Sequence, residues 1–242
     1  MSIKIAVCVR TRDEEHRIAQ YCEAWKGADA ILVADGGSVD KTKEIASTYP
    51  NVIIRDFTER TQLKNGYWRN NDSRHANFLF AWAKEYEADW VIYEDADVRP
   101  NYLLRSEYRN ILEYTDADYV SAVHFYLWGL DQHFPHLSKC NETHDAWCPC
   151  LFAFRGNQDF WTVNVPPAYD FRIGDKRVTN LNLDAKNIDL LPPYGLLHYA
   201  WDTPARADEK VHIYRKSGLI PGMQHPINFG GPLEDLPDYL HE

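Results

Sequence analysis

The chain has 242 residues, a 45% share of hydrophobic residues and a formal net charge of -10 at pH 7. These values fit one globular domain with a core that needs no disulfides, and the acidic charge argues against a non-specific nucleic-acid binder. No apolar run approaches the ~20 residues of a membrane-spanning helix, and the sequence opens without the pattern of a signal peptide. Because five cysteines cannot all pair internally, we expect a protein of the reducing cytoplasm.

The first half of the chain alternates strand-like and helix-like segments, a rhythm typical of α/β folds with a mainly parallel central sheet flanked by helices. Ser38 is the expected cap of one helix, and Pro100 stands where another could begin. The expected strands are Ile3–Val9, Ala30–Ala34, Val52–Arg55, Trp90–Tyr93 and Tyr119–Phe125, and the expected helices run over Asp13–Trp25, Ser38–Tyr49 and Asp72–Tyr86.

The second half of the chain is less regular. Strands are expected at Leu151–Phe154 and Leu196–Tyr199 and a helix at Ala205–Lys216. Residues 156–193 are expected to be mostly loop, and the tail from Gly218 to be irregular. No repeat or low-complexity linker divides the chain. We therefore expect a single domain over residues 1–242, with a regular half at 1–125 and a less regular half at 126–242.

Two carboxylates, Asp95 and Asp97, directly follow the expected strand Trp90–Tyr93. In open α/β sheets, ligands bind beyond the carboxyl ends of the strands. Two converging carboxylates need a compensating charge, and Mg²⁺ or Mn²⁺ supplies it while bridging a diphosphate. The alternative is a solvated acidic turn. The apolar strand before the pair, and the loop that begins at Asp35 after another strand, favour the metal site.

Three segments in this order resemble the nucleotide-binding half of family 2 glycosyltransferases. They are the opening strand with Arg10-Thr11-Arg12-Asp13-Glu14, the segment from Val33 to Thr42 with Asp35-Gly36-Gly37-Ser38, and the strand that ends in Glu94-Asp95-Ala96-Asp97. The resemblance covers residues 3–100 and implies a GT-A fold and a nucleotide-sugar donor, which is most often UDP-linked in this family. Residues 1–125 would then bind the donor, and 126–242 the acceptor.

The resemblance also implies roles for individual residues. Asp35, beside Gly36, would contact the base or ribose of the donor. Asp95 would lie near the ribose or the metal, and Asp97, as the second acid of the Asp-x-Asp motif, would bind the metal directly. Thr11 and Asp13 would line the nucleotide pocket, and Arg74 would meet the diphosphate. Two departures from the family pattern are Lys41 in place of a glycine and His75-Ala76 within the usual Arg-Asn pair.

His198 lies in a strand that resembles the late, His-bearing strand of several GT-A enzymes, where the imidazole completes the metal site. Imidazole binds Mn²⁺ readily, although a histidine among aromatic residues can also be structural. An inverting transfer needs a carboxylate that deprotonates the acceptor hydroxyl. The aromatic surroundings of Asp170 in the sequence favour it for this role. Other loop carboxylates are available for it: Asp145, Asp175 and Asp189.

A cluster of histidines and cysteines between residues 133 and 150 has the side-chain types of a structural Zn²⁺ site. Its spacing does not match the common zinc-finger patterns, so incidental histidines and buried thiols are the alternative. The members of the cluster are His133, His136, Cys140, His144, Cys148 and Cys150.

A metal-dependent glycosyltransferase is thus the function that the sequence favours. A nucleotidyltransferase that makes nucleotide sugars is an alternative, but the segment after the first strand has no glycine-rich loop. A non-catalytic module that binds nucleotide sugars is another. The acceptor stays open between a small molecule, a glycan, a protein and a modified DNA base.

Overall fold

The structure is a computed structural model that describes residues 2–62, 68–70, 72–129, 132–134, 139–141, 144–147, 149–165, 168–173, 176–177, 186–201, 203–217 and 233–240. Within these ranges, no helix has the length and apolar character needed to cross a membrane.

Four parallel strands form one half of the central sheet, in the order β3-β2-β1-β6. They are β1 (Ile5–Thr11), β2 (Ala30–Asp35), β3 (Val52–Asp56) and β6 (Trp90–Tyr93). All residues of β2 and β6 are buried, and so are all but one of β1. Continuous apolar runs of this kind are typical of parallel strands that are covered on both faces. The predicted α/β fold is confirmed.

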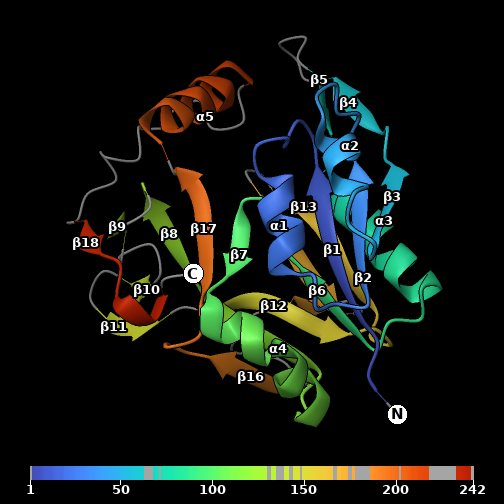
Figure 1. Cartoon of the computed structure of the whole chain (residues 1–242), viewed down its shortest axis with the longest axis vertical. Helices are drawn as coiled ribbons and strands as arrows, with labels where there is room; N and C mark the ends of the chain where they lie inside the picture. Colours follow the sequence, from blue (N-terminus) through green and yellow to red (C-terminus); the bar gives the residue numbers. More distant parts are fainter. Residues whose placement is uncertain are drawn as a thin grey trace.

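Helices pack on both faces of these strands (Figure 1). Helices α1 (Ile18–Ala24), α2 (Thr42–Ala46) and α4 (Tyr102–Tyr114) share one hydrophobic core. Helix α3 (Asp72–Glu85) contributes to a second core on the opposite face. Because successive side chains of a strand point to opposite faces, alternate residues of β1 contribute to the two cores. The strands are thereby fixed from both sides, and their carboxyl ends are left at one edge.

The second half of the chain extends the sheet with strands of both directions. Strand β12 (Pro149–Arg155) lies antiparallel between β6 and β8 (Tyr119–Trp128). Strand β17 (Leu196–Trp201) runs parallel to β8 and antiparallel to β7 (Val98–Pro100). The other described members of this sheet are β9 (Gln132–His133), β16 (Asn187–Leu190) and β18 (Glu234–Asp235).

Smaller elements surround the central sheet. Helix α5 (Pro204–Ser217) begins just beyond the carboxyl end of β17 (Figure 1), and a 3₁₀ turn covers Asp238–Leu240. Three small sheets contain β4 (Arg60–Gln62) with β5 (Trp68–Asn70), β10 (Lys139–Asn141) with β11 (His144–Trp147), and β13 (Phe160–Val165) with β14 (Ala168–Ile173) and β15 (Lys176–Arg177).

Three predictions of local structure were wrong. The segment 156–193, expected to be mostly loop, contains β13 to β16. Aromatic and β-branched residues of β13 and β14 share a core with α3, whereas β16 pairs with β8. Helix α2 covers only Thr42–Ala46, and Ser38 does not cap it, because its hydroxyl donates to Asp35 instead. Pro100 ends β7 rather than beginning a helix, and Asn101 is the cap of α4.

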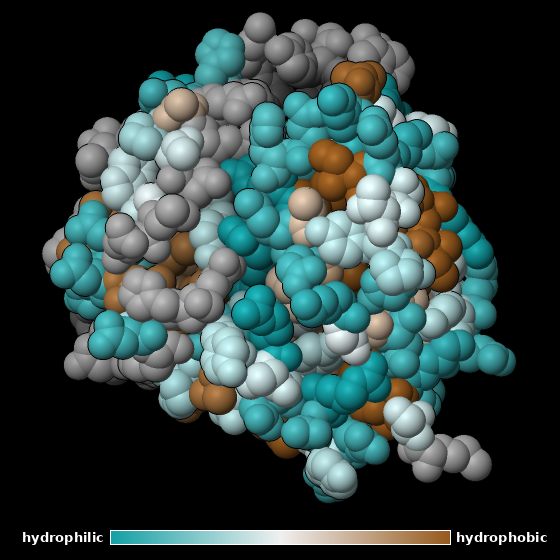
Figure 2. All heavy atoms as spheres, viewed as in Figure 1, coloured by the Kyte–Doolittle hydropathy of each residue, from teal (hydrophilic) through white to brown (hydrophobic). Residues whose placement is uncertain are grey.

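The molecular surface is mostly hydrophilic on the face shown in Figure 2. Apolar residues form only small patches there. Within the described part of the chain, the large apolar side chains that are exposed come from separate segments: Val39, Ile53, Tyr102, Tyr114, Ile188 and Leu191. Scattered residues of this kind are ordinary for a folded protein.

Candidate functional site

The carboxyl ends of β1, β2 and β6 meet at one edge of the sheet. Thr11 at the end of β1 lies opposite Asp35 at the end of β2, and Cys8 of β1 lies opposite Tyr93 at the end of β6. The ends of these three strands and the segments that follow contain most of the residues to which the resemblance to family 2 glycosyltransferases gives a role. This edge is where open α/β sheets bind their ligands.

Asp35 organises the loop after β2. Its side chain is fully buried, and its carboxylate accepts hydrogen bonds from the backbone amides of Gly37 (3.0 Å) and Ser38 (2.8 Å). The hydroxyls of Ser38 (2.5 Å) and Thr11 (3.2 Å) donate to the same carboxylate. Gly37 has φ +87°, a conformation that favours glycine. The carboxylate therefore binds this protein's own loop in the structure.

The segment after β1 is hydrogen-bonded to the same loop. The amide of Asp13 donates to the Ser38 hydroxyl (2.9 Å), and the Asp13 carboxylate accepts from the amide of Val39 (2.8 Å). The amide of Gly36 donates to the carbonyl of Thr11 (2.8 Å). Thr11, Asp13, Asp35 and Gly36 are thus brought together, as a network that joins the two loops beside the sheet edge.

Asp95 forms an ion pair with a residue that the sequence analysis did not single out. Its carboxylate lies 2.7 Å from Nη2 of Arg10, and Nη1 of Arg10 lies 3.3 Å from Asp72 at the start of α3. The Asp95 side chain is still 48% exposed. Arg10 thereby compensates the charge of the first acid of the motif. The signal in the sequence was an arginine near the end of a buried strand, as the first residue of the first motif segment.

Asp97 and His198 lie together at the same edge. Oδ1 of Asp97 is 3.5 Å from Nε2 of His198, and both side chains are mostly buried. Asp97 sits in a tight turn closed by the amide of Val98, which donates to the carbonyl of Asp95 (2.9 Å). The amide of Tyr199 donates to the carbonyl of Asp97 (2.7 Å), so β17 is fixed against this turn. Two residues about 100 positions apart in sequence are therefore neighbours.

The Asp97–His198 pair fits a divalent cation. A carboxylate oxygen and an imidazole nitrogen are both ligands of Mn²⁺, and two atoms 3.5 Å apart can both lie about 2.1 Å from one ion. Among the described side chains, no group of three or more histidines, cysteines and acids converges on one point. Two protein ligands leave coordination positions for the phosphates of a ligand and for water.

A second acid–histidine pair lies beside the first. Oε1 of Glu94 is 3.5 Å from Nε2 of His124, a residue of β8. Burial raises the pKa of Glu94, and the nearby His124 opposes this shift. Burial lowers the pKa of His124, but the charges of Glu94 and of the following aspartates outweigh it, so the net shift is upward. The sequence signals were an acid directly after an apolar strand and one histidine in the expected strand Tyr119–Phe125.

Arg74 lies in the first turn of α3 and is largely exposed. Its Nη1 is 2.9 Å from the carboxylate of Glu59. The neighbouring His75 points inward, where Nε2 donates to the carbonyl of Ala34 (2.9 Å) and the ring stacks on Phe57. The contact that the resemblance implies for Arg74, with a donor diphosphate, stays a prediction.

Asp189 is the only general-base candidate whose side chain lies in the described part of the structure. Asp189 is exposed on β16, which pairs with the amino-terminal part of β8, so it lies at the end of β8 remote from His198. The backbones of Asp145 and Asp170 belong to β11 and β14, but their side chains lie outside the described part of the structure. Asp175 lies outside the described residues altogether.

The proposed zinc cluster is described only in part. His133 is buried on β9 with its ring against Phe125, and Cys150 is exposed on β12. The other members have undescribed side chains or lie outside the described residues: His136, Cys140, His144 and Cys148. The zinc site stays a prediction.

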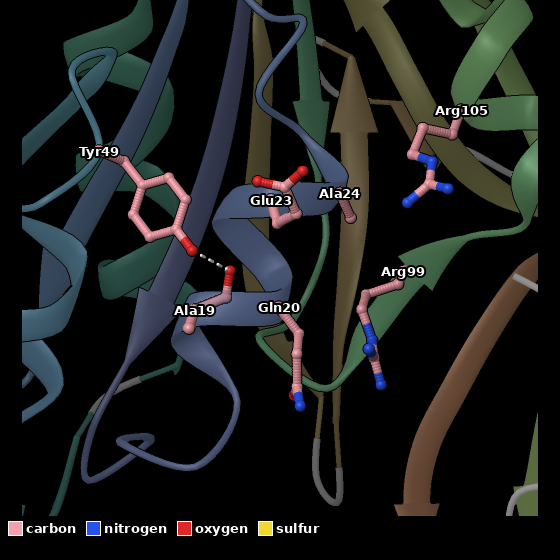
Figure 3. Close-up of a pocket in the computed structure, with 7 residues that line it drawn as sticks. All are labelled: Ala19, Gln20, Glu23, Ala24, Tyr49, Arg99 and Arg105. Atoms are coloured by element: carbon pink, nitrogen blue, oxygen red, sulfur yellow. Dashed lines mark hydrogen bonds between the residues drawn. The ribbon is translucent and has the colours of Figure 1, made fainter.

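A separate hollow of about 290 Å³ lies on the face that α1, α2 and α4 cover, between α1 and the segment from β7 to α4 (Figure 3). The guanidinium of Arg99 lies 3.7 Å from the centre of the Tyr199 ring, and Arg105 of α4 approaches the hollow from the same side. It is lined by Ala19, Gln20, Glu23, Ala24, Tyr49, Arg99 and Arg105. None of the residues predicted as ligands lines this hollow.

The arrangement defines a class of fold: an α/β sheet of GT-A type, as the motifs imply. The crystal structure of S. aureus TarS aligns with 88% of this chain at 14% sequence identity and a TM-score of 0.52. The alignment covers 40% of the TarS chain, so this chain spans less than half its length. This likeness confirms the fold that the sequence predicts.

Two further structures align with about half of this chain. S. aureus TarS 1-349 in complex with UDP-GlcNAc aligns over 52% of this chain and 35% of its own, at 17% identity and a TM-score of 0.41. Glucosyl-3-phosphoglycerate synthase from Mycobacterium tuberculosis, in complex with Mn²⁺, UDP and glucosyl-3-phosphoglycerate, aligns over 52% and 44%, at 18% identity and a TM-score of 0.37. The sequence matches no family model and no curated protein.

Proposed function

We propose that this chain is a metal-dependent glycosyltransferase that transfers a sugar from a nucleotide-sugar donor to a hydroxyl acceptor. The observation that carries the proposal is the pairing of Asp97 with His198 at the carboxyl edge of a GT-A-type sheet. TarS, whose fold the chain shares at a TM-score of 0.52, has been crystallised with UDP-GlcNAc. A UDP-linked sugar is accordingly the donor that we propose.

Each group at the edge has a proposed task. A divalent cation held by Asp97 and His198, preferably Mn²⁺, would neutralise the nucleoside diphosphate as it leaves. Arg10, near the end of β1, would orient Asp95 through their ion pair, so that the half-exposed carboxylate is available to the ribose. Asp35 holds the loop after β2, which would form a wall of the nucleotide pocket. Its carboxylate accepts from Thr11, while the amides of Asp13 and Gly36 donate to the Ser38 hydroxyl and the Thr11 carbonyl.

The two halves of the chain would bind different substrates. Residues 1–125 supply Asp97 and would bind the donor, whereas residues 126–242 supply His198 and would bind the acceptor. Asp170 remains our proposal for the base that deprotonates the acceptor hydroxyl, with Asp175 as the second choice. The site would therefore be complete only when both halves are folded together.

The activity is tested by incubating the protein with a panel of nucleotide sugars and measuring release of the nucleoside diphosphate, with Mn²⁺ or with EDTA. We expect turnover with Mn²⁺, and a loss of about 100-fold or more in Asp97→Asn and in His198→Gln. Asp116→Asn is the matched control, because Asp116 is exposed and pairs only with Lys186 among the described residues. Full turnover by Asp97→Asn, or in EDTA, would refute the proposal.

The same assay separates the alternatives. Release of pyrophosphate from a nucleoside triphosphate in the presence of a sugar phosphate would identify a nucleotidyltransferase. Binding of a nucleotide sugar without turnover, across a broad panel of acceptors, would identify a binding module.

A further inference from the structure

Among the described residues, His198 has no partner for the hydrogen bond that usually orients a metal-binding histidine. Such histidines almost always donate their second ring nitrogen to a carboxylate, a carbonyl or water. Here Nε2 faces Asp97, while Nδ1 is buried and has no hydrogen-bond partner among the described groups. The orientation of this ring must therefore come from its other neighbours.

Those neighbours come from β8. In the parallel pairing of β17 with β8, His198 lies opposite Tyr126, and Leu196 lies opposite His124. Residues two apart on a strand face the same side, so His124 and Tyr126 both flank His198. The ring of Tyr126 lies 4.9 Å from the His198 ring, and the ring of His124 lies 6.2 Å from it at an interplanar angle of 90°. The His198 ring is thus confined by two rings of one strand.

Glu94 is the group that fixes His124. It follows β6 directly, only 4% of its side chain is exposed, and its Oε1 lies 3.5 Å from His124 Nε2. Neither of these two atoms hydrogen-bonds another described group. Removing a carboxylate and an imidazole from water is costly, and two apolar side chains of similar volume would fill the same space at no such cost. Stability alone therefore does not explain the pair.

We propose that Glu94 and His124 are positioning residues that hold His198 in the orientation required for metal binding. The inference rests on the proposed function of Asp97 and His198. Neither Glu94 nor His124 needs to touch the metal or the donor. Glu94 would hold the ring of His124, and the ring of His124 would limit the orientations of the neighbouring His198 ring.

The first test measures Mn²⁺ binding rather than activity. The dissociation constant of Mn²⁺ is measured by electron paramagnetic resonance at fixed pH, and electron spin-echo modulation reports a directly coordinated imidazole nitrogen. We expect Mn²⁺ binding about 10- to 100-fold weaker in Glu94→Gln and in His124→Phe, with a diminished nitrogen signal. Ser121→Ala, another buried polar residue on β8, is the control and should bind Mn²⁺ as the wild type does.

A double variant separates positioning from a merely structural role. Glu94→Leu combined with His124→Phe replaces the buried pair with apolar groups, and unfolding in urea reports whether its stability equals that of the wild type. If the pair is structural, this stable variant binds Mn²⁺ normally, and the inference is wrong. If the pair positions His198, Mn²⁺ binding stays weak although the stability is retained.

Failure of the inference can be told apart from failure of the proposed function. If His198→Gln and Asp97→Asn bind Mn²⁺ as tightly as the wild type, the metal site itself is misassigned and both proposals fall. If those two variants lose Mn²⁺ while Glu94→Gln and the double variant retain both affinity and the nitrogen signal, only the positioning role is refuted.

Discussion

The Asp35 carboxylate accepts four hydrogen bonds beside the candidate metal site. Two amides and two hydroxyls donate to its buried carboxylate, which leaves no exposed oxygen for a ligand in this structure. The resemblance implied a contact of this residue with the base or ribose. The structure supports an indirect contribution, in which Asp35 shapes the loop that a nucleotide would meet.

We therefore expect Asp35→Ala to lower the free energy of unfolding by about 3 kcal/mol, because two partly buried backbone amides and two hydroxyls lose their acceptor. Urea unfolding followed by fluorescence measures this change. Asp56→Ala is the matched control: Asp56 ends the neighbouring strand β3 but is exposed, so its removal should change stability far less. Equal effects of the two substitutions would contradict the assigned structural importance of Asp35.

His75 makes the stability of the folded protein depend on pH. Burial, assisted by the charge of Arg10, lowers the pKa of His75 to about 4. Because the unfolded chain has a His pKa near 6.5, it binds more protons than the folded protein between pH 4 and 6.5. The stability associated with neutral His75 is thus complete above about pH 6.5 and falls by about 3 kcal/mol as the pH drops to 4.

The measurement is urea unfolding at pH 7 and at pH 4.5 for the wild type and for two variants. His75→Gln should reduce the loss of stability on acidification, since glutamine can still donate to the carbonyl of Ala34 without titrating. His16→Gln should behave as the wild type, because His16 is 90% exposed. An unchanged pH dependence in His75→Gln would show that other groups cause the acid sensitivity.

At the scale of elements, Asn101 joins α4 to the chain segment that leads into β17. Its side-chain oxygen accepts from the amide of Leu104 (3.0 Å) and caps the helix, and its amide group donates to the carbonyl of Pro193 (2.8 Å). Its backbone amide donates to the carbonyl of Gly195 (2.9 Å). The start of β17, and with it His198, is therefore held by a cap that lies four residues after Asp97.

Asn101→Ala should lower the free energy of unfolding by about 2 kcal/mol, because the cap and the bond to Pro193 are both lost. Ser106→Ala, at an exposed position of the same helix, is the control and should have little effect. Thermal unfolding followed by circular dichroism is the measurement. A loss no larger than that of the control would mean that α4 does not depend on this cap.

The sequence predicted those helices and strands that have a clear pattern in their own residues. Continuous apolar runs predicted β1, β2, β6 and β17, and the expected helices Asp72–Tyr86 and Ala205–Lys216 correspond to α3 and α5. Strands β13 and β14 were missed because the prolines at 166 and 167 and the neighbouring polar residues mask a short aromatic alternation. These residues form strands because they pack against α3, and strand formation depends on packing more than on intrinsic preference. The sequence alone does not show that α3 lies beside them.

At the scale of the whole molecule, the candidate metal site joins the two halves of the chain. The turn after β6 supplies Asp97, and β17 returns from the second half to place His198 beside it. The residue types and their order could be predicted, because each follows or lies within an apolar strand. The ion pair of Arg10 with Asp95 and the burial of Glu94 beside His124 could not, because both depend on which strands become neighbours.

Calorimetric titration of UDP, with and without saturating Mn²⁺, into the wild type and Asp97→Ala tests the central claim most directly. We predict that Mn²⁺ strengthens UDP binding at least tenfold in the wild type, a coupling of about 1.4 kcal/mol, and that Asp97→Ala abolishes this gain. Equal UDP affinity in all four conditions, or a Mn²⁺ effect that survives in Asp97→Ala, would contradict the assignment of Asp97 as the residue that joins the metal to the diphosphate.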